Sequence, residues 1–68
     1  MSVSKTKTTF ASKYWFARGY ADAVMGEMFD PPSSEVNDYY QEICNLDIVK
    51  EFSSGFEQGQ KDKINGII

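Results

Sequence analysis

The chain of 68 residues contains no histidine and only one cysteine, Cys44. It therefore lacks the commonest general base and the commonest zinc partner of cysteine, and the usual Cys-His nucleophile cannot form. One cysteine also excludes an intrachain disulfide and a metal site built from several thiolates. We expect no catalytic residues, no cofactor and no metal, and we interpret the chain as a protein that is not an enzyme.

Long apolar runs are also missing. No stretch approaches the roughly 20 apolar residues of a membrane-spanning helix, and residues 1–9 lack the hydrophobic segment of a signal peptide. These features predict a cytoplasmic protein. A domain of this length has a small core unless dimerisation enlarges it.

Acids are absent from residues 1–18, and bases are absent from residues 19–49. The first segment has a charge of +4, from Lys5, Lys7, Lys13 and Arg18, and the second has a charge of -7; the remainder sums to zero, which gives the net charge of -3. A central stretch this acidic repels nucleic-acid phosphates and attracts basic surfaces. We therefore expect a protein partner with a basic surface, and no direct binding of nucleic acid.

One sequence pattern is present twice: an aromatic residue, a small residue, a second aromatic residue and a second small residue at i, i+3, i+4 and i+7. On a helix these four positions share one face. Glycine costs a helix about 1 kcal/mol relative to alanine, so the repeat predicts a close helix–helix crossing, within one chain or at a homodimer seam. The helix-packing residues are Phe16, Gly19, Tyr20 and Ala23 in the first copy and Phe52, Gly55, Phe56 and Gly59 in the second.

The pattern of helix signals divides the chain into a flexible N-terminal arm, residues 1–8, and a single helical domain, residues 9–68. The first helix is expected from about Phe10 to Met25, because Gly26 is a typical helix stop and two prolines follow it.

Ser33 or Ser34 predicts the start of a second helix near Glu35. We place a break near Asn45 and a third helix from Asp47 to about Lys63, because the apolar residues on either side of the break would point in different directions along one straight helix. One long helix buried on both sides is the alternative. No segment has a convincing strand pattern, so the fold class is all-α, a small three-helix arrangement with a close glycine and aromatic crossing.

Three acidic residues, Glu35, Asp38 and Glu42, lie on one face of the expected second helix. They form either a solvated face or a docking surface for a basic patch on another protein. Tyr14, Trp15 and Phe16 are consecutive and cannot all point inward from one helix, so we expect at least one of them to be partly exposed. The same reasoning applies to Tyr39 and Tyr40 on the second helix. Exposed aromatic residues favour binding, so the candidate partner-binding residues are Glu35, Asp38, Glu42, Tyr14, Trp15 and Tyr39.

Arg18-Gly19-Tyr20 with Ala23 and Gly26, followed by a proline and later by Gly55-Phe56, resembles the ribosome modulation factor family and similar small proteins of phages and mobile elements. The resemblance covers residues 15–32 and 52–62 and implies a small helical fold and association with the ribosome. The chain departs from the family pattern in three ways. It is acidic, and Asp30-Pro31 stands where the family has Cys-Pro. A segment that carries Glu35, Asp38 and Glu42 is also inserted between the two glycine and aromatic units.

Together these observations predict a non-enzymatic, protein-binding modulator or inhibitor of phage or mobile-element origin. It would use its acidic helical surface against a nucleic-acid-binding protein or defence complex of the host, in the host cytoplasm. One alternative is a ribosome-associated modulator of the ribosome modulation factor type, contacting RNA through the four basic residues of the N-terminal segment. A self-assembling structural dimer is the other.

Overall fold

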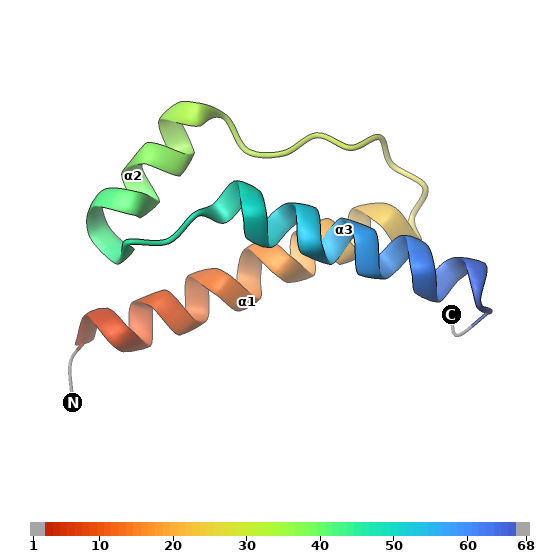
Figure 1. Ribbon diagram of the computed structural model, residues 1–68, viewed down its shortest axis with the longest axis horizontal. Helices are drawn as coiled ribbons and strands as arrows, with labels where there is room; N and C mark the ends of the chain where they lie inside the picture. The colour runs from red at the N-terminus through yellow and green to blue at the C-terminus, as the bar shows by residue number, and fades with distance from the viewer. Residues whose placement is uncertain (1–2, 67–68) are drawn as a thin grey trace.

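The computed structural model describes the backbone of residues 3–66 and the side chains of residues 9–66. Within that part of the chain there are three α-helices and no strand: α1 (Val3–Val24), α2 (Ser34–Cys44) and α3 (Ile48–Ile64). Helices α1 and α3 run in the same direction and cross each other, and α2 lies beside the beginning of α3 (Figure 1). The expected all-α, three-helix arrangement is confirmed.

Helix α1 begins at Val3, earlier than the expected start near Phe10. The backbone of residues 3–8 is helical, and the flexibility of the arm over residues 1–8 stays a prediction; residues 1–2 lie outside the described part. No proline or glycine interrupts the sequence before Gly19, so nothing stops the helix from extending toward the N-terminus.

Helix α1 ends at Val24, one residue before the expected Met25, and Gly26 forms the stop that the sequence predicts. This glycine has a φ of 78°, a left-handed conformation that glycine adopts without steric cost. Its N–H bonds to the Ala23 carbonyl at 3.1 Å, and the Glu27 N–H bonds to the Asp22 carbonyl at 2.8 Å. These two bonds are the Schellman pattern, which satisfies the last carbonyls of a helix.

Two parallel helices cannot be joined by a short turn, so the chain returns along the molecule between α1 and α3. Residues 27–33 form an irregular segment that runs back toward the beginning of α3 (Figure 1). Pro31 and Pro32 keep this segment out of helical conformation. Phe29 attaches it to α3, with ring centroids 5.8 Å from Phe52 and 5.2 Å from Phe56.

The predicted break between the second and third helices is confirmed, and the alternative of one long helix is wrong. Asn45 ends α2 in a left-handed conformation with a φ of 52°, which asparagine tolerates better than most residues. The Asp47 carboxylate then accepts the Lys50 N–H at 3.2 Å and caps α3. The Asn37 side-chain oxygen accepts the Ile48 N–H at 2.9 Å and so ties α2 to the first turn of α3.

The two copies of the repeated pattern pack against each other where α1 and α3 cross. A side chain on Gly19 would collide with the Phe52 carbonyl oxygen, and one on Gly55 would collide with the Phe16 carbonyl oxygen. The contact is reciprocal: each glycine receives the backbone of the aromatic residue that opens the other copy. The repeat is therefore a packing motif within one chain, which is one of the two arrangements that the sequence predicts. The two helices lie so close at this crossing that a second copy of the chain cannot enter between them.

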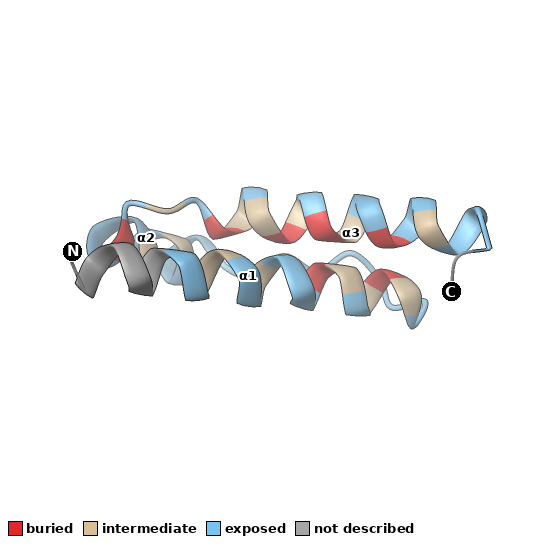
Figure 2. Ribbon diagram, turned by 90° about the horizontal axis from the view of Figure 1, so that it is seen from below, coloured by how far each residue is buried: buried red, intermediate tan, exposed pale blue. Residues whose placement is uncertain are grey.

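The core is small and lies along this crossing. The buried apolar residues are Ala23, Cys44, Ile48 and Phe52, and Phe52 is only 1% exposed. Buried residues line the facing sides of α1 and α3 (Figure 2). The repeat also predicts that its aromatic rings fill the space beside the crossing. Phe16 contacts Gly55 of α3 through its backbone, and the residue is 36% exposed.

Candidate protein-interaction surface

The acidic side chains of α2 all face solvent. Glu35, Asp38 and Glu42 are exposed, and none of them forms an ion pair or a hydrogen bond to a side chain among residues 9–66. Helix α2 is held in place by its caps: the Ser33 hydroxyl accepts the Val36 N–H at 3.3 Å. The three carboxylates therefore form a negative surface on an ordered helix, which we call the acidic stripe.

Four aromatic rings connect α1 to α2. Tyr14, Trp15, Tyr40 and Tyr39 form a chain of edge-to-face contacts, with centroid separations of 5.1, 5.9 and 5.6 Å. Trp15 is half-buried in the middle of this chain, and its indole N–H is buried without a hydrogen-bond partner among the described residues. Edge-to-face pairs are worth about 0.5–1.5 kcal/mol each beyond the area that they bury, so these contacts position α2 against α1.

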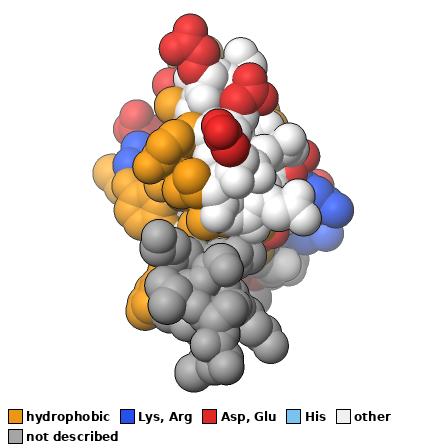
Figure 3. Space-filling view, turned by 90° about the vertical axis from the view of Figure 1, so that its left-hand side faces the viewer, with side chains coloured by type: hydrophobic (Ala, Val, Ile, Leu, Met, Phe, Trp, Pro, Cys, Tyr) orange, Lys and Arg blue, Asp and Glu red, His pale blue; other side chains and the backbone are white. Residues whose placement is uncertain are grey.

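An open apolar groove of about 440 Å³ lies between α1 and α2. Two of its walls carry large exposed side chains: Phe10 on α1 is 71% exposed, and Tyr39 on α2 is 58% exposed. Hydrophobic side chains gather at this end of the molecule, with Asp and Glu side chains above them (Figure 3). The lining residues are Phe10, Ala11, Tyr14, Tyr39, Tyr40, Ile43 and Cys44.

The groove and the acidic stripe adjoin each other on α2. At about 100° per residue, Tyr39 lies about 40° from Glu35 and about 60° from Glu42 around the helix axis. A partner seated in the groove would therefore meet carboxylates at its edge. Exposed apolar area bordered by charge is the usual composition of a protein-binding surface, in which the apolar centre supplies affinity and the charged rim supplies orientation.

The described basic residues of α1 do not form a separate binding surface. Lys13 and Arg18 are exposed, but Arg18 is engaged locally: it donates a 2.9 Å hydrogen bond to the Tyr14 hydroxyl, and its guanidinium lies 5.9 Å from the centroids of the Tyr14 and Trp15 rings. The side chains of Lys5 and Lys7 lie outside the described residues.

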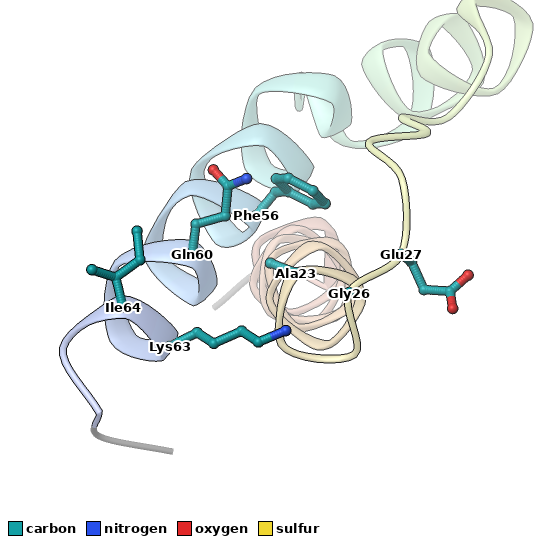
Figure 4. Close-up of a pocket in the computed structure, with 7 residues that line it drawn as sticks. All are labelled: Ala23, Gly26, Glu27, Phe56, Gln60, Lys63 and Ile64. Atoms are coloured by element: carbon teal, nitrogen blue, oxygen red, sulfur yellow. The ribbon is translucent and has the colours of Figure 1, made fainter.

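A second cavity, of about 420 Å³, lies between the ends of α1 and α3. Lys63 reaches across it toward the C-terminal end of α1 near Gly26 (Figure 4). A cation at this position interacts favourably with the negative end of the helix dipole. The lysine therefore has a structural explanation. The other polar lining residues are Glu27 and Gln60, and the Glu27 carboxylate points away from Lys63 (Figure 4).

One polar contact links the middle of α1 to the last turns of α3. The Tyr20 hydroxyl donates a 2.6 Å hydrogen bond to the Asp62 carboxylate, whose other oxygen accepts a 2.8 Å bond from the Gln58 amide. The hydrogen bond to Asp62, with smaller contributions from burial and from the carboxylate charge, raises the pKa of Tyr20 above its ordinary value. Ionisation of this tyrosine therefore opposes the α1–α3 contact.

Within residues 9–66 no group of three or more histidine, cysteine, aspartate or glutamate side chains could hold a metal ion. None of the helices, over the residues that the structure describes, is long and apolar enough to cross a membrane.

The structure brings together residues that the sequence analysis named separately. Tyr14 and Tyr39 line the groove, and Glu35, Asp38 and Glu42 lie on the helix that forms one of its walls, whereas Trp15 lies half-buried beneath the rings. Phe10 and Ile43 are not among the binding residues that the sequence predicts, because the sequence places Phe10 at a helix start and Ile43 on the apolar face of the second helix without indicating whether that face is covered. The spacing of Phe10 and Tyr14, four residues apart on a helix whose other side packs on α3, was the available signal.

Comparisons of the chain with protein-family models, with curated proteins and with solved structures found no match.

Proposed function

We propose that the chain is a non-enzymatic binding protein that docks a basic surface of another protein on the acid-bordered groove between α1 and α2. The observation that carries this proposal is that three exposed carboxylates, which have no ion-pair partner among residues 9–66, lie beside exposed aromatic side chains on one short helix. Packing within the chain explains neither feature, because α2 is fixed by its caps, by Asn37 and by the inner rings Trp15 and Tyr40.

The kind of partner follows from the charge. A row of carboxylates presents the same sign of charge as a row of phosphates to a basic groove that normally holds nucleic acid, and electrostatic steering would favour that encounter. We therefore propose a nucleic-acid-binding protein or defence complex as the target, and modulation or inhibition by competition as the effect. Phage or mobile-element origin, and action in the host cytoplasm, are the parts of the proposal that rest on the sequence resemblance alone.

The test is affinity capture with two baits of equal charge. In the first, Glu35, Asp38 and Glu42 are all changed to lysine; in the second, the exposed acids Glu27, Asp30 and Glu57 are changed to lysine instead. Both baits should keep the helical circular dichroism of the native chain, because substitutions at exposed positions cost about 0.5 kcal/mol or less. Capture from nuclease-treated host lysate should be lost with the first bait and retained with the second.

The groove is tested separately. Tyr39→Ser removes an exposed ring that we place in the centre of the contact and should weaken capture by about tenfold or more, as expected for an aromatic anchor. Equal capture by the native chain and by both the triple variant and Tyr39→Ser would contradict the proposal.

The alternative of a ribosome-associated modulator makes the opposite prediction. Its basic contacts would come from Lys5, Lys7, Lys13 and Arg18, and reversal of the acidic stripe would remove repulsion and strengthen binding to phosphates. Capture that depends on intact RNA and increases with the triple reversal would establish this alternative.

A further inference from the structure

Helix α1 has a second apolar face, which is directed away from α3. Its residues follow one another at spacings of three and four and share one side of the helix. All of them are exposed, and Met25 is 70% exposed. At about 100° per residue, Ala17 and Ala21 lie on the side of α1 opposite the positions that pack on α3, whereas Phe10 and Tyr14 at one end also line the groove beside α2. We call this surface the outer face of α1; it consists of Phe10, Tyr14, Ala17 and Ala21, together with Met25 in the turn that follows the helix.

The molecule exposes more surface than a compact chain of its size. Its accessible surface is 4915 Å², roughly 600 Å² more than the ~4,300 Å² expected for a folded monomer of this mass. Its radius of gyration is 12.9 Å, against ~11 Å for a compact domain of this length. A stable interface covers about 800 Å² on each partner, so the excess is of the order that one additional helix contact would remove.

We propose that a second copy of this chain covers the outer face, with the two α1 helices antiparallel and crossing at Ala17 and Ala21. The two alanines let the backbones approach closely, and the larger side chains at either end fill the space beside the crossing. The surface is self-complementary under a two-fold axis, as a symmetric dimer requires.

Charge selects the antiparallel orientation. Residues 1–18 carry bases and no acid, whereas residues 19–30 carry Asp22, Glu27 and Asp30 and no base. Antiparallel pairing lays the basic half of each α1 along the acidic end of the other copy. Parallel pairing would lay the bases of one copy along the bases of the other, and like charges repel.

The experiment is sedimentation velocity of the full chain over a range of concentrations. The native chain should associate reversibly to twice its mass of 7.7 kDa. Ala21→Glu and Ala17→Glu each bury a carboxylate at the crossing and should raise the dimer dissociation constant about tenfold or more. Ser54→Glu, at an exposed position of α3, introduces the same charge elsewhere and should leave dissociation unchanged.

Orientation is tested by oxidative cross-linking, with the buried Cys44 left in place. A mixture of Met25→Cys and Tyr14→Cys chains should form a disulfide-linked pair, because these positions lie nearly opposite each other when the helices cross at Ala17 and Ala21, and Met25→Cys alone should not. A monomer at every concentration, a dimer weakened equally by Ser54→Glu, or cross-linking of Met25→Cys alone would overturn the proposal. A dimer that is lost with Tyr39→Glu but retained with Ala21→Glu would place the contact in the groove and would also overturn the proposed α1–α1 contact. Capture of a partner by the acidic stripe is measured in a separate experiment.

Discussion

Three glycines set the distance between α1 and α3. At Gly59, a side-chain carbon would lie 2.7 Å from the Tyr20 carbonyl oxygen and 2.8 Å from the Ala23 methyl. At Gly19 and Gly55 the obstacles are backbone atoms of the opposite helix, which cannot move without moving that helix. The absence of a side chain at these positions is therefore a requirement of the crossing.

Gly55→Ala should destabilise the fold even though alanine favours a helix by about 1 kcal/mol. Relief of the collision with Phe16 requires the helices to separate, at a cost of about 1–3 kcal/mol, and Gly55→Leu should cost more. Ser54→Ala, at the adjacent exposed position, should be neutral or slightly stabilising. Urea unfolding followed by circular dichroism measures the stability of these three variants. A Gly55→Leu chain whose unfolding midpoint is higher than that of the native chain would contradict the packing account.

Tyr20→Phe should change how stability depends on pH. The pKa of Tyr20 is raised in the folded state, so this hydroxyl stabilises the fold fully below its unfolded pKa of about 10, and the contribution is lost as the pH rises through the higher folded value. The difference in unfolding free energy between the native and Tyr20→Phe chains should be constant below about pH 10 and should shrink above it. A difference that stays constant as the pH rises above about 10 would show that the hydrogen bond to Asp62 is not formed.

Sequence reasoning succeeded at the glycines because the pattern occurs twice and glycine has a known cost in a helix. It did not predict the backbone contact of Phe16, because helical periodicity assigns a residue to a face without saying whether its side chain or its backbone makes the contact. The glycines bring the helices so close that the backbone of Phe16 contacts Gly55.

At the scale of the helices, the capping residues made most boundaries predictable. Ser33 and Asp47 accept hydrogen bonds at the starts of α2 and α3, and Gly26 adopts the left-handed conformation that stops α1, as the sequence predicts. The start of α1 was missed because Ser2, Thr8, Thr9 and Ser12 all have side chains that favour a helix start, and the local pattern does not choose among them. The parallel direction of α1 and α3 was not predictable from local pattern either, since it depends on a return segment attached to α3 by Phe29.

Asn37→Ala should loosen the corner between α2 and α3. The substitution removes the acceptor of the Ile48 N–H and leaves that amide without its partner at a half-buried helix start, at a cost of about 1–2 kcal/mol. Asn37→Asp keeps an acceptor oxygen at the same place and should cost less. Hydrogen exchange of the Ile48 amide gives a local measurement; equal protection in the native and Asn37→Ala chains would mean that this hydrogen bond does not hold the corner.

At the scale of the whole molecule, exposure of the apolar side of α2 is the feature that sequence reasoning did not anticipate. The sequence places Val36 and Ile43 on an apolar face of the second helix, and the structure leaves both exposed. Helix periodicity predicts that a face is apolar, but whether another element covers it depends on how the whole chain is arranged. In residues 3–66 there are three helices, two of which pack closely on each other, and that part of the chain has no further helix to place over α2.

The central claim is that α2 presents its acidic stripe to a basic partner. Chemical labelling of carboxylates with a water-soluble carbodiimide, read by mass spectrometry, tests it most directly when the free chain is compared with the chain in its captured complex. Labelling should fall at Glu35, Asp38 and Glu42 in the complex and stay unchanged at Glu27, Asp30 and Glu57, which are equally open in the free chain. Labelling that is unchanged at the acidic stripe, or that falls only at Glu27, Asp30 and Glu57, would contradict the account.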